Sequence, residues 1–262
     1  MNIYVLFALI ASLGTWALTA LGAAIVLFFK TPKQQVLNLM LGFSAGVMIA
    51  ASFWSLLQPA IERANQTLKT PSCIVVTIGF ILGAIFIWLS DKAVNIAISM
   101  ANGNQNKNNR VVLLILSITL HNIPEGLAVG VAFGLLKGNF TSSSLMGALS
   151  IAIGIGLQNF PEGAAVSLPL RREGYSRKKC FFFGQMSAIV EPIAAITGAI
   201  LVSIIETFLP FALSFAAGAM ILVSVHELIP ECQQNKLERP YIATTGIILG
   251  FSVMMLLDVM LG

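Results

Sequence analysis

Long apolar segments of bilayer-spanning length occupy almost the whole chain and constrain its fold more than any other feature. Hydrophobic residues make up 57% of the 262 residues, charged residues only 10%, and the mean hydropathy is +0.89. A soluble domain carries about 25% charged residues, whereas a membrane-crossing helix needs about 20 mostly apolar residues. The sequence therefore predicts an all-α membrane protein that has no soluble domain.

Eight segments of the required length can be distinguished along the chain. They run approximately over residues 4–29, 36–58, 72–97, 111–135, 143–169, 181–205, 209–230 and 241–261. Turn-forming and charged residues separate them, so we expect a single transmembrane domain over residues 1–262. The first segment lacks a preceding basic region and is long enough to span, which favours a retained helix over a cleaved signal peptide.

The basic residues predict the orientation of the chain. All but three of the 15 Lys and Arg residues fall in one set of loops, and the other set holds only Arg63, Lys69 and Lys137. Basic residues concentrate in cytoplasmic loops, so we expect the first set to be cytoplasmic and both termini to be extracytoplasmic. The default location is a cell membrane, plasma or inner. Charges placed in this way indicate topology and do not predict a nucleic-acid-binding surface.

Two near-copies of one polar motif interrupt the fourth and fifth apolar segments. One copy reads LHNIPEG from position 120 and the other reads LQNFPEG from position 157. Polar and ionisable groups inside a membrane usually face a pathway or a bound ion. Helix residues four apart share a face, so His121 projects with Glu125, and Gln158 projects with Glu162. We therefore expect one intramembrane ion site built from both motifs.

The chemistry of the motifs favours a divalent transition metal. Pro124 and Pro161 each free a backbone carbonyl, which is tolerated in lipid only beside a cavity, water or a cation. Glu125 and Glu162 would repel each other in a low dielectric unless a cation lay between them. Imidazole, carboxylate and amide oxygen together suit zinc, iron(II), manganese or cadmium, but not copper(I).

The chain also contains internal repeats. Segments four and five align at an offset of 37 residues; segments two and seven align at an offset of 172, where Ser52 matches Ser224. The paired segments are expected to cross in opposite directions, and inverted repeats are typical of secondary transporters with a site at the repeat interface. Chance recurrence of small residues on helix-packing faces is the alternative, and it explains the second pair better than the first.

These motifs and the segments around them resemble the ZIP family of divalent-metal transporters, in its prokaryotic branch. The resemblance covers nearly the whole chain and includes VEP from position 190 and HELIPE from position 226. It implies eight transmembrane helices in a three-plus-two-plus-three arrangement that carry zinc, cadmium, iron(II) or manganese into the cytoplasm. We expect no resident cofactor and no enzymatic activity, and the partners are the divalent ions and the lipid bilayer.

The resemblance also implies a binuclear metal site on the motif helices and segment six. Its first position would be formed by Met48, His121, Glu125, Gln158 and Glu162, and its second by Asn122, Asn159 and Glu191, with Glu125 and Glu162 bridging. Many members carry His at position 158 and some carry Asp at position 159, so the two amides make the second position less anionic. His226 and Glu227 are a candidate exit site, and Glu62 and Asp258 a candidate entrance.

Two alternative functions and one mode of assembly follow from the same residues. A calcium-type exchanger also uses paired acidic repeats, but His, Gln and Met at the site argue against so hard a cation. An intramembrane metallohydrolase of the HExxH type would need a second His where Pro230 stands. The small-residue face around Gly79–Gly83 would allow a homodimer.

Overall fold

The computed structural model describes residues 2–28, 34–102, 107–138, 140–172, 174–204, 206–233 and 241–261. Within these ranges the regular elements are all helical, and no strand is present. The α-helices are α1 (Ile3–Phe28), α2 (Gln34–Ala51), α3 (Gln58–Thr67), α4 (Ser72–Asn102), α5 (Lys107–Gly134), α6 (Ser142–Arg172), α7 (Arg177–Met186), α8 (Val190–Ile204), α9 (Leu209–Val223), α10 (Ile229–Cys232) and α11 (Ile242–Leu261). The short elements are η1 (Ser52–Leu57) and η4 (Ser224–Leu228), which are π-helical, and η2 (Leu135–Lys137) and η3 (Glu206–Phe208), which are 3₁₀.

Helical segments of membrane-crossing length and apolarity account for most of the described chain. Seven qualify: Ile3–Phe28, Gln34–Thr67, Ser72–Ala97, Ser142–Arg171, Arg177–Val202, Leu209–Cys232 and Ile242–Leu261. The expected span at 111–135 coincides with α5, which is helical but is not among the seven. The all-α membrane protein is thus confirmed, while the eight crossings, their three-plus-two-plus-three grouping and the single domain stay predictions.

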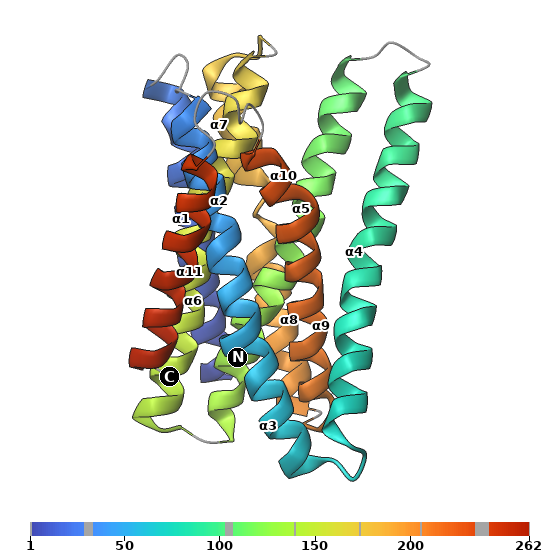
Figure 1. Ribbon diagram of the computed structural model, residues 1–262, viewed down its shortest axis with the longest axis vertical. Coiled ribbons are helices and arrows are strands. Elements are labelled where there is room, and N and C mark those ends of the chain that lie inside the picture. Colours follow the sequence, from blue (N-terminus) through green and yellow to red (C-terminus); the bar gives the residue numbers. More distant parts are fainter. Residues whose placement is uncertain are drawn as a thin grey trace.

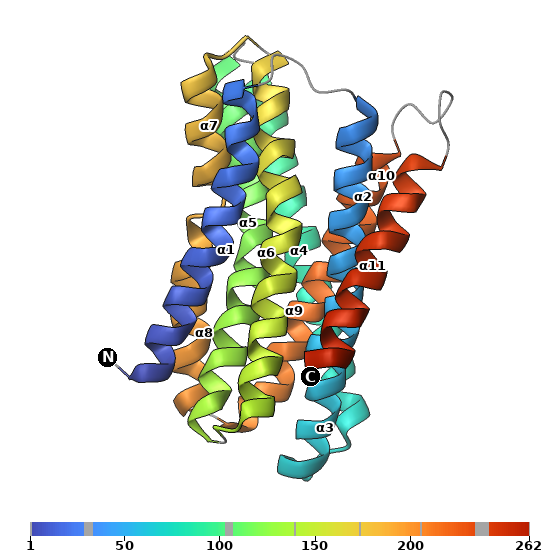
Figure 2. The same cartoon turned by 90° about the vertical axis from the view of Figure 1, so that its left-hand side faces the viewer.

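The helices run side by side, and their connections gather at two opposite ends (Figure 1). Helix α3 marks one end, whereas α7 and α10 mark the other. Both chain termini lie toward the α3 end in the two views (Figures 1 and 2). This placement agrees with the expectation that the two termini share one side.

The most extensive helix contacts pair α2 with α11, α4 with α9, α1 with α6, and α5 with α8. The first two of these pairs are built alike. A Cβ atom on Gly250 of α11 would overlap the carbonyl oxygen of Phe43 in α2, and one on Gly83 of α4 would overlap that of Phe215 in α9. Phe43 and Phe215 are related by the 172-residue offset of the sequence repeat. The repeat therefore extends to close backbone approaches in the core.

The same packing corrects one expectation from the sequence. Gly79 and Gly83 of α4 face α9 of the same chain, where a Cβ atom would meet Ser214 or the backbone of Phe215. These glycines are therefore used inside the molecule and do not form a free face for a homodimer. A homodimer through another surface stays a prediction.

A π-helical turn occurs at the same place in each repeat, as η1 and as η4. The hydroxyl of Ser52 donates to the carbonyl of Met48 at 2.7 Å, and that of Ser224 donates to the carbonyl of Met220 at 2.8 Å. A proline follows each π turn and cannot donate a backbone hydrogen bond. Such turns are frequent at functional sites, because they re-aim side chains within a continuous helix.

The span predicted at 181–205 is present but consists of two helices, α7 and α8, separated by a turn at residues 187–189. Pro192 has no N–H to donate to the carbonyl of Ala188, which favours a break at this point. The N–H of Glu191 donates to that carbonyl at 3.0 Å instead. Helix α8 therefore begins inside the bundle with an acidic residue in its first turn.

Candidate metal pathway

The two polar motifs meet in the interior, where α5 lies against α6. The amide Nε2 of Gln158 donates to Oε1 of Glu125 at 2.6 Å, and both side chains are completely or almost completely buried. Helix α2 joins them, because the hydroxyl of Ser44 donates to Oε1 of Glu162 at 2.7 Å. Met48, one turn after Ser44, is also buried on α2 and stays a predicted ligand.

Unpartnered buried oxygen atoms mark the interior of the bundle. Among the described residues, the buried side-chain polar atoms without a hydrogen-bond partner are Asp91 Oδ2, Glu125 Oε2, Gln158 Oε1, Asn159 Oδ1 and Asp258 Oδ2. All five are acceptors, and three belong to the paired motifs. Buried polar groups are nearly always hydrogen-bonded in native proteins, so a set composed only of acceptors requires a donor or a cation. The residue types and the missing partners make this region a candidate cation site.

The residues expected at the second metal position are bonded to protein groups. Nδ2 of Asn122 donates to the carbonyl of Ser187 at 2.9 Å and so satisfies a backbone group in the turn between α7 and α8. Nδ2 of Asn159 donates to both carboxylate oxygens of Glu191, at 2.8 and 2.9 Å. The hydroxyl of Thr15 from α1 donates to Oε2 of Glu191 at 2.5 Å.

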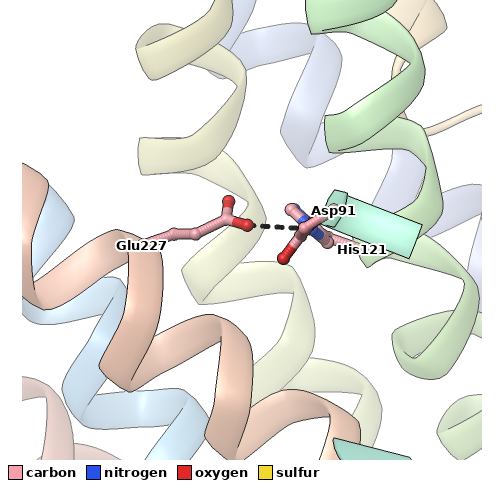
Figure 3. Close-up of side chains that lie close together, drawn as sticks. All are labelled: Asp91, His121 and Glu227. Carbon is pink, nitrogen blue, oxygen red and sulfur yellow. Dashed lines mark hydrogen bonds and ion pairs between the residues drawn. The ribbon is translucent and has the colours of Figure 1, made fainter. Parts of the chain in front are cut away.

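His121 takes part in a different cluster from the one that the resemblance implies. Its Nε2 atom lies 3.0 Å from Oδ1 of Asp91 and 3.0 Å from Oε1 of Glu227 (Figure 3). One imidazole nitrogen carries at most one proton and cannot donate fully to two carboxylates. Ligand atoms of these three residues all lie within 4.8 Å of one another, and no other such group of His, Cys, Asp or Glu occurs in the described ranges. The cluster has the donor set and the spacing for a divalent cation.

Asp91 lies outside the repeated motifs and was not predicted as a site residue, although the sequence contained a signal for it. An acidic residue inside the predicted span 72–97 is costly in lipid and indicates a functional position. Of the two candidate exit residues, Glu227 belongs to the cluster, and His226 lines an adjacent cavity of about 380 Å³ that Asp91 and Asn95 also line. The candidate exit residues therefore lie together, toward the α7 end of the molecule.

The candidate entrance residues share a larger cavity near α3. Its volume is about 740 Å³, and Glu62, Ser55 and Asp258 are among the residues that line it. Oδ1 of Asp258 accepts hydrogen bonds from Ser55 at 2.7 Å and from Ser150 at 3.0 Å. Glu62 is exposed and accepts only a long bond from Gln58, at 3.2 Å, among the contacts described.

Comparison with known proteins identifies the family. The family model of the ZIP zinc transporters matches residues 3–112 and 99–258. The chain is 40% identical to zinc transporter ZIP11 of Xenopus tropicalis, with 98% of each chain covered. It is 37% identical to zinc transporter GufA of Myxococcus xanthus, over 97% of this chain and 98% of that one. It is 35% identical to zinc transporter ZIPB of Bordetella bronchiseptica, over 100% of this chain and 83% of the relative. The chain therefore belongs to the ZIP family of zinc transporters.

Proposed function

We propose that this protein carries divalent transition-metal ions, zinc foremost, across a cell membrane into the cytoplasm. Cadmium, iron(II) and manganese are further substrates of the same site. The observation that carries the proposal is the pair of unpartnered acceptor oxygens on Glu125 and Gln158, at the meeting point of the two motifs. Lone pairs buried without donors are what a dehydrated cation needs in order to replace its water ligands.

The ion follows a route that joins the three polar regions. It enters through the cavity that Glu62 and Asp258 line near α3, which we expect to face the outside. It is then bound between Glu125 and Glu162, with Gln158 and Met48 beside them. It leaves through the cluster of Asp91, His121 and Glu227, which we expect to face the cytoplasm. Both termini are extracytoplasmic in this orientation, and the protein binds substrate without a catalytic role.

The donor atoms favour borderline metals over harder cations. Carboxylate and amide oxygens alone would accept calcium or magnesium, but the imidazole of His121 and the thioether of Met48 are softer ligands. His121 lies four residues before Glu125 on the same face of α5. We propose that its imidazole accepts the ion from Glu125 and passes it to Asp91 and Glu227. During this step one group of helices rocks against the rest about the site.

Uptake of zinc into proteoliposomes tests this function, with a zinc-sensitive dye enclosed in the vesicles. Glu162→Ala should abolish saturable uptake, because one of two site carboxylates is lost. Glu231→Ala is the matched control, since Glu231 is an exposed carboxylate on α10 outside the proposed route. Uptake that survives Glu162→Ala at the control level would refute a path through the motifs. Competition by cadmium, iron(II) and manganese measures the substrate range.

A further inference from the structure

The carboxylate of Glu191 is surrounded by hydrogen-bond donors. Its Oε1 atom accepts from Nδ2 of Asn159, and its Oε2 atom accepts from the same nitrogen and from the hydroxyl of Thr15. All three side chains are at most 2% exposed. The reverse orientation of the Asn159 amide would place its oxygen against two carboxylate oxygens, acceptor against acceptor. The hydrogen bonds therefore define which amide atom faces Glu191.

The carboxylate of Glu125 has the opposite environment. It accepts one bond, from Gln158, and its Oε2 atom has no partner. Both glutamates are buried, so the difference lies in the donors that surround them and not in their exposure. A cation binds where lone pairs are free, and a buried carboxylate that already has donors gains less from a metal.

Local structure gives Glu191 a further source of positive potential. It lies in the first turn of α8, which begins at Val190 after the break that follows α7. The partial positive charge at a helix N-terminus stabilises an acidic side chain in that position. Thr15 from α1 and Asn159 from α6 complete the environment, so groups from three helices stabilise this carboxylate without an ion.

We propose that the amide of Asn159 and the hydroxyl of Thr15 take the place of a second cation beside Glu191, so that this chain carries one metal ion at a time. The inference rests on the proposed function and concerns how many ions the site holds. The expected binuclear site is reduced to its first position, between Glu125 and Glu162. The bonds at Glu191 instead act as a structural connection of α1, α6 and α8. Thr15 and Asn159 are positioning residues in this account, since neither touches the transported ion.

This connection coincides with close helix packing. A Cβ atom on Gly163 of α6 would overlap the carbonyl oxygen of Thr19 in α1, one turn beyond Thr15. A Cβ atom on Gly126 of α5 would similarly meet the carbonyl oxygen of Glu191 in α8. Backbones in such contact cannot slide past each other without separating. We therefore expect the helices that hold Glu191 to move as one unit during transport.

The number of zinc ions bound per chain tests the proposal. Purified full-length protein in detergent is titrated with zinc, and bound metal is measured by calorimetry and by elemental analysis after desalting. We expect one ion in the wild type and in Glu191→Gln, and two in Asn159→Asp, because an added carboxylate needs a cation in place of the lost donor. Thr15→Val combined with Asn159→Asp should increase the affinity of the second site for zinc. The matched control for Thr15→Val is Thr245→Val, because Thr245 is an exposed threonine of α11.

The outcomes separate this inference from the function on which it rests. Two ions in the wild type, with one of them lost in Glu191→Gln, would overturn the single-ion proposal and leave transport intact. A wild type that bound no zinc would overturn both. If Asn159→Asp does not fold, the Glu191→Gln variant still tests the proposal. One zinc ion bound per chain in this variant supports the proposal, and none contradicts it.

Discussion

Exchanging a buried glutamate for glutamine should have opposite effects on stability at positions 125 and 191. The substitution is chemically the same, and both side chains are almost completely buried. Glu191 accepts hydrogen bonds from Thr15 and Asn159, whereas Glu125 accepts from Gln158 alone and leaves Oε2 without a partner. Removal of the negative charge therefore takes away favourable hydrogen bonds at position 191. At position 125 it removes a buried charge that is poorly solvated.

The size of the effect at position 191 follows from the bonds. A hydrogen bond to a charged group contributes about 1.5–3 kcal/mol, and a neutral one about 1 kcal/mol. Glu191→Gln leaves one acceptor oxygen for the two donor groups and turns an NH₂ group toward one of them. We expect the free energy of unfolding of the metal-free protein to fall by about 2–4 kcal/mol. For a chain of this length, that corresponds to a decrease in Tm of about 4–16 °C.

At position 125 the introduced amide meets an available partner. Gln158 donates through Nε2 to Oε1 of Glu125, and its own Oε1 atom is an unpartnered acceptor. Two amides in this arrangement can form reciprocal hydrogen bonds, and the isolated buried charge disappears. We expect Glu125→Gln to raise the free energy of unfolding by about 1–2 kcal/mol, or Tm by about 2–8 °C, while zinc uptake is lost.

Thermal unfolding in detergent, followed with a thiol-reactive dye, measures both changes. Cys180 and Cys232 are buried thiols, so they react only after the helices separate, whereas exposed Cys73 gives a constant baseline. Zinc should raise Tm in the wild type and in Glu191→Gln, but not in Glu125→Gln, since a ligand stabilises only a state that binds it. Equal decreases in Tm for the two variants, or a zinc response retained in Glu125→Gln, would refute the reasoning.

Three other substitutions probe the packing and the two ends of the route. Gly163→Ala should destabilise the protein by about 1–3 kcal/mol, because its methyl group would overlap the backbone of Thr19, and the thiol assay measures the lower Tm. Asp91→Asn should slow zinc uptake about tenfold, because it removes one carboxylate of the proposed exit cluster. The maximal rate is measured in proteoliposomes at saturating zinc, and an unchanged rate would contradict a role for Asp91 in release. Ser55→Glu, beside Asp258, should increase zinc uptake at low zinc concentration by adding a carboxylate to the proposed entrance, and an unchanged uptake curve would contradict a role for this end.

Apolar segment length predicted most of the fold, because a bilayer leaves few structures open to a 20-residue hydrophobic run. The division of the sixth span into α7 and α8 was not predicted, although Pro192 was visible in the sequence. A proline inside a span can either kink a helix or break it. The outcome depends on which groups form hydrogen bonds with the carbonyls that the proline leaves free. Here Asn122 satisfies the carbonyl of Ser187, and that contact between distant helices exists only in the folded chain.

Site residues could be predicted where they belong to the repeated motif. They could not be predicted where a distant helix supplies the hydrogen-bonding partner. The repeated motif was enough to single out Glu125 and Gln158, and the two side chains do meet. Thr15 carried no signal, since a threonine in an apolar helix is an ordinary packing residue. Its role arises because α1 packs against the N-terminus of α8 and brings a hydroxyl group to Glu191.

The inverted repeat explains why the two ends of the route have related positions but different chemistry. Asp91 and Asp258 occupy matching places on α4 and α11, the helices whose glycine contacts are equivalent. At the repeat offset of 172 residues, Glu227 of η4 corresponds to Ser55 of η1. The α7 end of the molecule therefore combines Asp91 with a second carboxylate, whereas the α3 end pairs Asp258 with a hydroxyl group. We therefore expect a passing ion to be held more weakly at the α3 end than at the α7 end, while the concentration gradient alone determines the net direction of transport.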